Sequence, residues 1–172
     1  MFVLGVDPGL SRCGYAVVEP GPRVGRSRPV AIGVIRTSPE TSLPFRLLEL
    51  QHEVRALLSE YQPSVVAVER IFFQNNVRTA VGVSQAAGIV LAEAAGRGAT
   101  VVQYSPNEVK AAVTGDGAAD KVAVGAMVQV LLGLDGPPRP ADAADAAALA
   151  LCYLAHDPTG GRRRTSPHEV RR

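Results

Sequence analysis

The first nine residues constrain the fold more than any other stretch of the chain. Residues 2–6 form an apolar run of strand length that ends at Asp7, and Pro8 and Gly9 then turn the chain. Asp7 continues a strand of the interior type, where an unpaired carboxylate is costly to bury. Such an acid is held by hydrogen-bond donors or by a metal ion, or it bonds its own backbone in the turn. The rest of the chain has to decide between these alternatives.

The order of apolar segments predicts one α/β domain over residues 1–156. A chain of 172 residues with 47% hydrophobic content is long enough to bury a sizeable core. Three sequential strands with short links predict an antiparallel meander, in which residues 19–29 are a connection. The expected strands are 2–7, 10–18, 30–37, 64–70 and 100–104. The expected helices are 43–61, 79–96, one opened by a capping box at Ser105, Pro106 and Glu108, one from 121 to about 132, and 141–153.

A second interior-type strand also ends in an acid. Residues 65–68 are an uninterrupted apolar run followed by Glu69, which is typical of a parallel strand buried on both faces. In open α/β sheets, functional sites gather beyond the carboxyl ends of the strands. If the two strands are parallel neighbours, Asp7 and Glu69 converge. The alternative is that each acid separately caps a helix or lies on the surface.

Two further acids open the last helix. Asp142 and Asp145 are three residues apart, so a helix places them on one side. The helix dipole favours acids at this end, and capping is therefore the simpler interpretation. Against it, the helix is composed almost entirely of Ala and Leu, as a buried helix is. A buried carboxylate pair on such a helix needs a cation nearby.

These four acids together have the chemistry of a metal site. Clustered carboxylates without His or Cys are hard oxygen ligands, suited to Mg²⁺ or Mn²⁺. Four of them suffice for two ions ~3.5–4 Å apart, the arrangement that clamps attacking and leaving oxygens in phosphodiester displacement. We expect Asp7 to bridge both ions, Glu69 to hold one, and Asp142 with Asp145 to hold the other.

The basic residues are unevenly distributed. The net charge is only +2, and the only lysines are Lys110 and Lys121. Compact ammonium groups at these two places would pair with phosphate oxygens, whereas the simpler interpretation is solvated surface lysine. Five arginines crowd residues 157–172, whose composition predicts a disordered tail outside the domain.

Two features predict a cytoplasmic protein without a membrane segment. Cys13 and Cys152 are far apart within apolar segments, which indicates reduced core thiols. No stretch approaches the ~20 apolar residues that span a bilayer, and the N-terminus lacks the basic region of a signal peptide.

At these motifs the sequence resembles the RuvC family of Holliday-junction resolvases, which have the ribonuclease H-like fold. The resemblance covers residues 1–155 and rests on five segments in order: 5–9 with Gly14 and Tyr15, 68–73, 104–110, 120–121 and 141–146. It implies an α/β fold with a mixed five-stranded sheet, helices on both faces and a homodimer. It also implies Mg²⁺-dependent, symmetric nicking of two strands of a four-way junction during DNA recombination and repair, alongside the RuvAB branch-migration motor.

The resemblance also implies roles for individual residues. Asp7, Glu69, Asp142 and Asp145 match the metal-binding catalytic acids of the family. Lys110 and Lys121 match catalytic lysines near the scissile phosphate. Phe72 matches an aromatic residue beside the junction centre; its neighbour Phe73 and the nearby Arg78 are further candidates for DNA contact.

Three alternatives remain open. An actin-like ATPase also has an acid and a glycine after its first strand, but this chain is too short for the two halves of that fold. A ribonuclease H-like nuclease of another specificity, such as one that cuts RNA–DNA hybrids, would carry the same acids. A catalytically silent junction-binding protein would not need four intact acids.

Overall fold

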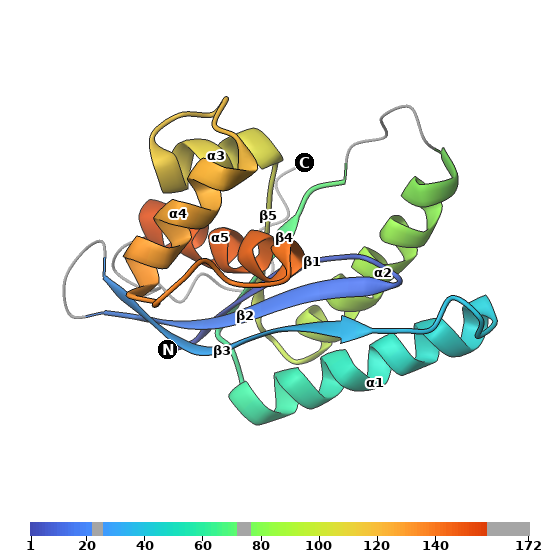
Figure 1. The fold of residues 1–172 in the computed structure, drawn as a ribbon. Helices are drawn as coiled ribbons and strands as arrows, with labels where there is room; N and C mark the ends of the chain where they lie inside the picture. Colours follow the sequence, from blue (N-terminus) through green and yellow to red (C-terminus); the bar gives the residue numbers. More distant parts are fainter. Residues whose placement is uncertain (22–25, 72–76, 158–172) are drawn as a thin grey trace, which may run out of the picture.

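A mixed five-stranded sheet forms the centre of the computed structural model, which describes residues 1–21, 26–71 and 77–157, with side chains at 77–79 left out. The strand order is β3-β2-β1-β4-β5 (Figure 1). The hairpin strands pair antiparallel, whereas β1, β4 and β5 are parallel neighbours. The strands are β1 (Val3–Asp7), β2 (Arg12–Pro20), β3 (Ser27–Arg36), β4 (Val65–Glu69) and β5 (Thr100–Tyr104). The predicted sheet and its meander are confirmed.

Helices cover both faces of this sheet, as predicted. Two of them pack on one face and three on the other, which creates two separate hydrophobic cores (Figure 1). The first pair is α1 (Leu43–Tyr61) and α2 (Val77–Gly96). The other three are α3 (Pro106–Thr114), α4 (Lys121–Leu132) and α5 (Ala141–His156).

Local sequence signals account for several element boundaries. Ser105 and Glu108 form the predicted capping box of α3, in which the Ser105 amide donates to Glu108 Oε2 at 2.7 Å. The prediction for residues 19–29 was wrong in part, because β2 continues to Pro20 and β3 begins at Ser27. The Pro and Gly residues there obscured a hairpin whose end is tied by an ion pair between Arg28 and Glu19.

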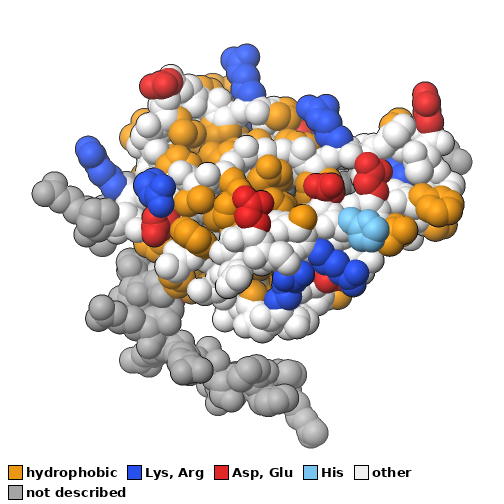
Figure 2. Space-filling model, turned by 90° about the horizontal axis from the view of Figure 1, so that it is seen from below, with side chains coloured by type: hydrophobic (Ala, Val, Ile, Leu, Met, Phe, Trp, Pro, Cys, Tyr) orange, Lys and Arg blue, Asp and Glu red, His pale blue; other side chains and the backbone are white. Residues whose placement is uncertain are grey.

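The α1 side of the molecule retains exposed hydrophobic side chains. Phe45 is 65% exposed, and Leu43 and Leu48 of the same helix and Val81 of α2 are also exposed. Figure 2 views this side and shows hydrophobic surface interspersed with charged groups. Apolar surface of this kind is compatible with a protein partner.

Two predictions from composition concern the cysteines and the membrane. Cys13 and Cys152 are both free and buried, as predicted. In the described part of the chain, no helix has the length and apolar character needed to cross a membrane. The predicted Arg-rich tail lies outside the described residues from 158 onward, so the domain boundary at 156 stays a prediction.

Helix α5 packs closely on the sheet because its own inner residues and the strand residues beneath it are small. Ala143, Ala146 and Ala147 are fully buried. A Cβ atom added to Gly5 would lie 2.0 Å from the Ala146 carbonyl oxygen, and one added to Gly14 would lie 2.0 Å from the Asp142 carbonyl oxygen. Only glycine therefore permits the start of α5 to rest on β1 and β2.

This close approach predicts that Gly14→Ala is destabilising. The methyl group would meet a backbone carbonyl that cannot rotate away, so we expect a loss of about 1–3 kcal/mol in unfolding free energy. Gly88→Ala on α2 is the control, because nothing lies within 4 Å of its added Cβ and alanine favours helix. Urea denaturation of both variants measures the difference, and equal stabilities would contradict the proposed contact.

Candidate active site

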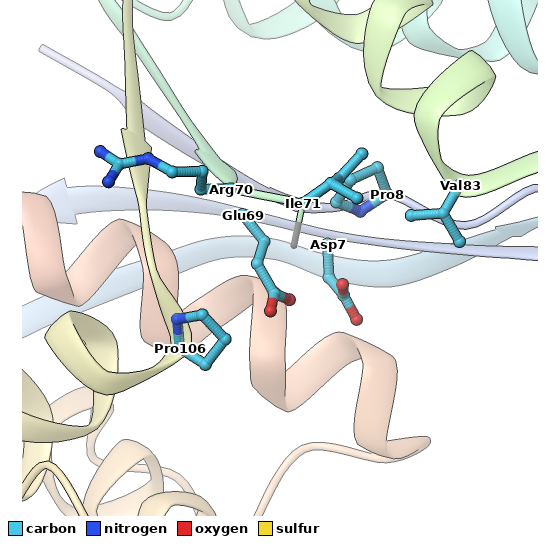
Figure 3. Close-up of a pocket in the computed structure, with 7 residues that line it drawn as sticks. All are labelled: Asp7, Pro8, Glu69, Arg70, Ile71, Val83 and Pro106. Atoms are coloured by element: carbon cyan, nitrogen blue, oxygen red, sulfur yellow. The ribbon is translucent and has the colours of Figure 1, made fainter. Parts of the chain in front are cut away.

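Asp7 and Glu69 lie side by side at the carboxyl ends of adjacent parallel strands. Val6 is in register with Val68, so the next residue of each strand is the acid. In Figure 3 both carboxylates extend from the sheet in the same direction, toward α5. The two strands are therefore parallel neighbours, and Asp7 and Glu69 converge as predicted for that arrangement.

The first turns of α5 bring two more carboxylates to this place. Asp142 Oδ2 lies 3.4 Å from Arg12 Nε, and Asp145 Oδ2 lies 3.0 Å from Lys121 Nζ. The N-cap of α5 is Pro140, and no side chain makes a capping hydrogen bond. The acids therefore face cations of β2 and α4 rather than capping their own helix.

Burial, together with the crowding of carboxylates, raises pKa values within the cluster. Burial, followed by the charges of Glu69 and Asp145, raises the pKa of Asp7 to about 8. Burial also raises the pKa of Glu69, although its hydrogen bond with Asp7 and the charge of Lys121 act in the opposite direction. The Asp145 carboxylate raises the pKa of Lys121. The cluster carries more negative charge than its neighbours neutralise, and it therefore favours a proton or another cation.

Pockets open around the acids. Asp7, Glu69 and Pro106 contribute to a cavity of about 370 Å³, which also contacts Val83 of α2 (Figure 3). A smaller cavity of about 100 Å³ is lined by Glu69, Asp145 and both lysines, Lys110 of α3 and Lys121 of α4. The structure thus brings the two predicted lysines to the same cavity as two of the acids.

The donor chemistry of the cluster fits a hard divalent cation. All four acids supply carboxylate oxygens, and burial, followed by the charges of the other three acids, raises the pKa of Asp7, so its ionised form would be stabilised by a bound cation. Within residues 1–21, 26–71 and 77–157, however, no three Asp, Glu, His or Cys side chains are close enough to share an ion. Asp142 and Asp145 instead form ion pairs with Arg12 and Lys121, which partly neutralise the negative charge of the cluster.

The remaining predicted site residues are not placed by the structure. Phe72 and Phe73 lie outside the described residues, and Arg78 lies on α2 with its side chain undescribed. Arg12, by contrast, was not predicted to lie beside the acids. Arg12 begins β2, just after the turn that follows Asp7. The antiparallel pairing of β1 and β2 brings it back beside the acids, and this position depends on the strand register.

Comparison with known proteins gives a family match across almost the whole described chain. Residues 3–153 match the family model described as crossover junction endodeoxyribonuclease RuvC. The protein of that description from Salinispora arenicola is 50% identical over 175 residues, covering 100% of this chain and 98% of the relative. The one from Thermobifida fusca is 54% identical over 154 residues, covering 90% and 84%.

Solved structures give the same result. The Thermus thermophilus RuvC structure has a TM-score of 0.86 at 36% identity, covering 93% of this chain and 97% of that one. T. thermophilus RuvC in complex with a Holliday junction substrate has a TM-score of 0.87 at 36% identity, covering 93% and 96%. The predicted ribonuclease H-like fold is therefore confirmed.

Proposed function

The chain belongs to the RuvC family of crossover junction endodeoxyribonucleases, and from this premise we propose that it resolves four-way DNA junctions. The reaction is symmetric nicking of two strands during recombination and repair. The observation that carries the proposal is the pairing of Asp7 with Glu69 at adjacent strand ends, against the acid-bearing start of α5. The junction complex of the Thermus relative supports the choice of substrate. The family match also sets the actin-like ATPase aside.

Asp7, Glu69, Asp142 and Asp145 are the proposed metal ligands, with Mg²⁺ as the metal and Mn²⁺ as a substitute. Two bound ions would neutralise charge on the reacting phosphate and lower the pKa of the attacking water. In the metal-free structure Oδ2 of Asp142 contacts Arg12 and Oδ2 of Asp145 contacts Lys121, so metal binding through these oxygens would compete with the two ion pairs. Asp7 belongs at the centre of this set because the other three acids all raise its pKa.

The lysines have a separate proposed role. Lys121, once released from Asp145, and Lys110 would donate hydrogen bonds to phosphate oxygens beside the scissile bond. Phe72, Phe73 and Arg78 stay candidates for DNA contact, with Phe72 favoured for stacking on an unpaired base.

The proposed assembly is a homodimer that works with the RuvAB motor in the cytoplasm. Symmetric nicking needs two active sites, and the exposed apolar side chains of α1 and α2 offer surface for a second copy (Figure 2). The two free thiols fit a reducing compartment. Residues 1–156 are the proposed nuclease domain, and 157–172 are the proposed disordered tail.

The decisive experiment is cleavage of a labelled synthetic four-way junction with and without Mg²⁺. We expect paired nicks in opposing strands only when the metal is present. Duplex DNA of the same sequence and an RNA–DNA hybrid are the controls. Preferential cutting of the hybrid would favour the other nuclease class, whereas junction binding without nicking would favour a silent binding protein.

Metal binding also predicts a change in thermal stability without DNA. Because Mg²⁺ binds the folded cluster, a concentration of 100 Kd stabilises it by about 2.7 kcal/mol. We expect the Tm to rise by several degrees on titration with MgCl₂, and Asp7→Asn to remove most of the rise. NaCl at matched ionic strength is the control for screening. Equal shifts with both salts would contradict a specific site.

A further inference from the structure

We propose that Arg12 and Arg36 form a second phosphate-binding site, which continues the DNA path from the acids across the end of β2 and β3. The inference rests on the proposed junction-cleaving function and extends it to residues outside the acid and lysine cluster. It concerns a contact with the DNA backbone beyond the reacting phosphate.

Strand pairing places the two arginines together. Arg12 is in register with Arg36 at the end of the β2–β3 ladder. Paired residues of an antiparallel ladder have their side chains on the same face of the sheet. That face is the α5 face, because Arg12 contacts Asp142 and the next same-face pair, Gly14 with Val34, lies under the start of α5.

The charge balance at this place is positive. Arg12 is paired with Asp142, but its side chain is still 58% exposed. Arg36 is exposed, and no ion pair involves it in the part of the chain that the structure describes. Of these two arginines only Arg12 has a carboxylate partner among the described residues, and that partner, Asp142, is itself a proposed metal ligand.

A third guanidinium lies at the same end of the sheet and is held by neutral groups. Arg46 of α1 donates from Nε to Thr37 Oγ1 at 3.0 Å and from Nη2 to Ser11 Oγ at 2.6 Å. Thr37 is only 5% exposed and donates to the Leu10 carbonyl oxygen at 2.6 Å, which fixes it in place. The Arg46 charge is thus held beside the β1–β2 turn without neutralisation by these contacts.

Like charges directly opposite each other in a ladder are destabilising, so the Arg12–Arg36 pair has no stabilising role in the sheet by itself. A guanidinium fork matches the geometry of phosphate oxygens. A bound phosphate would relieve the repulsion between the two arginines. It would also attract Arg12 away from Asp142 and so release this carboxylate for a metal ion.

Junction binding by an Arg36 variant tests the proposal. Affinity for a fluorescent four-way junction is measured without divalent metal at several NaCl concentrations, so that cleavage does not enter. We expect Arg36→Gln to weaken binding at least threefold and to reduce the slope of log affinity against log salt by about 0.9, one duplex phosphate contact. Arg36→Lys, which keeps the charge, should retain the wild-type slope.

Arg28→Gln is the matched control, because it removes an exposed arginine from the opposite end of the same strand. We expect its slope to equal that of the wild type. An unchanged slope in Arg36→Gln, or the same reduction in Arg28→Gln, would overturn the phosphate site while junction binding itself stands. A wild-type protein that does not bind junctions would overturn the proposed function as well.

Discussion

Asp7→Asn is expected to abolish junction nicking, with a rate at least about 100-fold below the wild type. The other three carboxylates all repel the negative charge of Asp7. A bound cation is therefore expected to be stabilised most by the carboxylate at this position. An amide keeps the shape of the side chain but removes its charge. Single-turnover cleavage of a four-way junction at saturating enzyme and Mg²⁺ measures the effect without interference from binding.

Whereas Asp7→Asn should lower the rate of nicking, its affinity for the junction should be unchanged or higher. Removing one negative charge from the cluster reduces its repulsion of DNA phosphates, so Asp7→Asn should bind equally well or more tightly without metal. Glu53→Gln, on the exposed side of α1, removes a carboxylate away from the site and serves as the control. Residual nicking above a few per cent of the wild-type rate would remove Asp7 from the central role.

The same substitution is expected to change how stability depends on pH. The pKa of Asp7 is about 8 in the folded protein, against an ordinary value of 3.8. Below about pH 4 the folded and unfolded states both carry the proton, and Asp7 has no effect on their balance. Between pH 4 and 8 the folded state retains a proton that the unfolded state has lost. Stability therefore falls as pH rises through this window.

Asp7→Asn removes this pH dependence. The unfolding free energy of the variant should therefore increase relative to that of the wild type as pH rises. Without metal, we expect the two to differ by less than about 1 kcal/mol at pH 4 and by about 3–6 kcal/mol above pH 8. Urea denaturation of both proteins at intervals of one pH unit measures their difference in unfolding free energy. Groups that titrate equally in both proteins cancel in this difference. A difference that stays constant with pH would mean that Asp7 is ionised throughout and that the cluster is less crowded than its geometry indicates.

Much of this protein follows from local sequence patterns. The apolar runs that end at Asp7 and Glu69 predicted β1 and β4 because a strand buried on both faces needs continuous hydrophobic side chains. The capping box at Ser105 predicted the start of α3, and the Ala-rich run after Pro140 predicted α5. Residues 19–29 were misread because Pro and Gly usually end strands, whereas the cross-strand ladder carries both strands through much of this segment.

The sequence alone predicts which residues form the candidate site, because an acid at the end of a buried strand or on a buried helix is costly unless a cation compensates it. How these acids come together depends on strand pairing and helix packing. Parallel pairing of β1 with β4 places Asp7 beside Glu69, some sixty residues away in the sequence. Gly5 and Gly14 allow α5, which carries the other two acids, to pack closely on the same sheet. The partners Arg12 and Lys121 likewise depend on strand register and helix packing. Periodicity describes one element at a time, whereas contacts between elements depend on the whole fold.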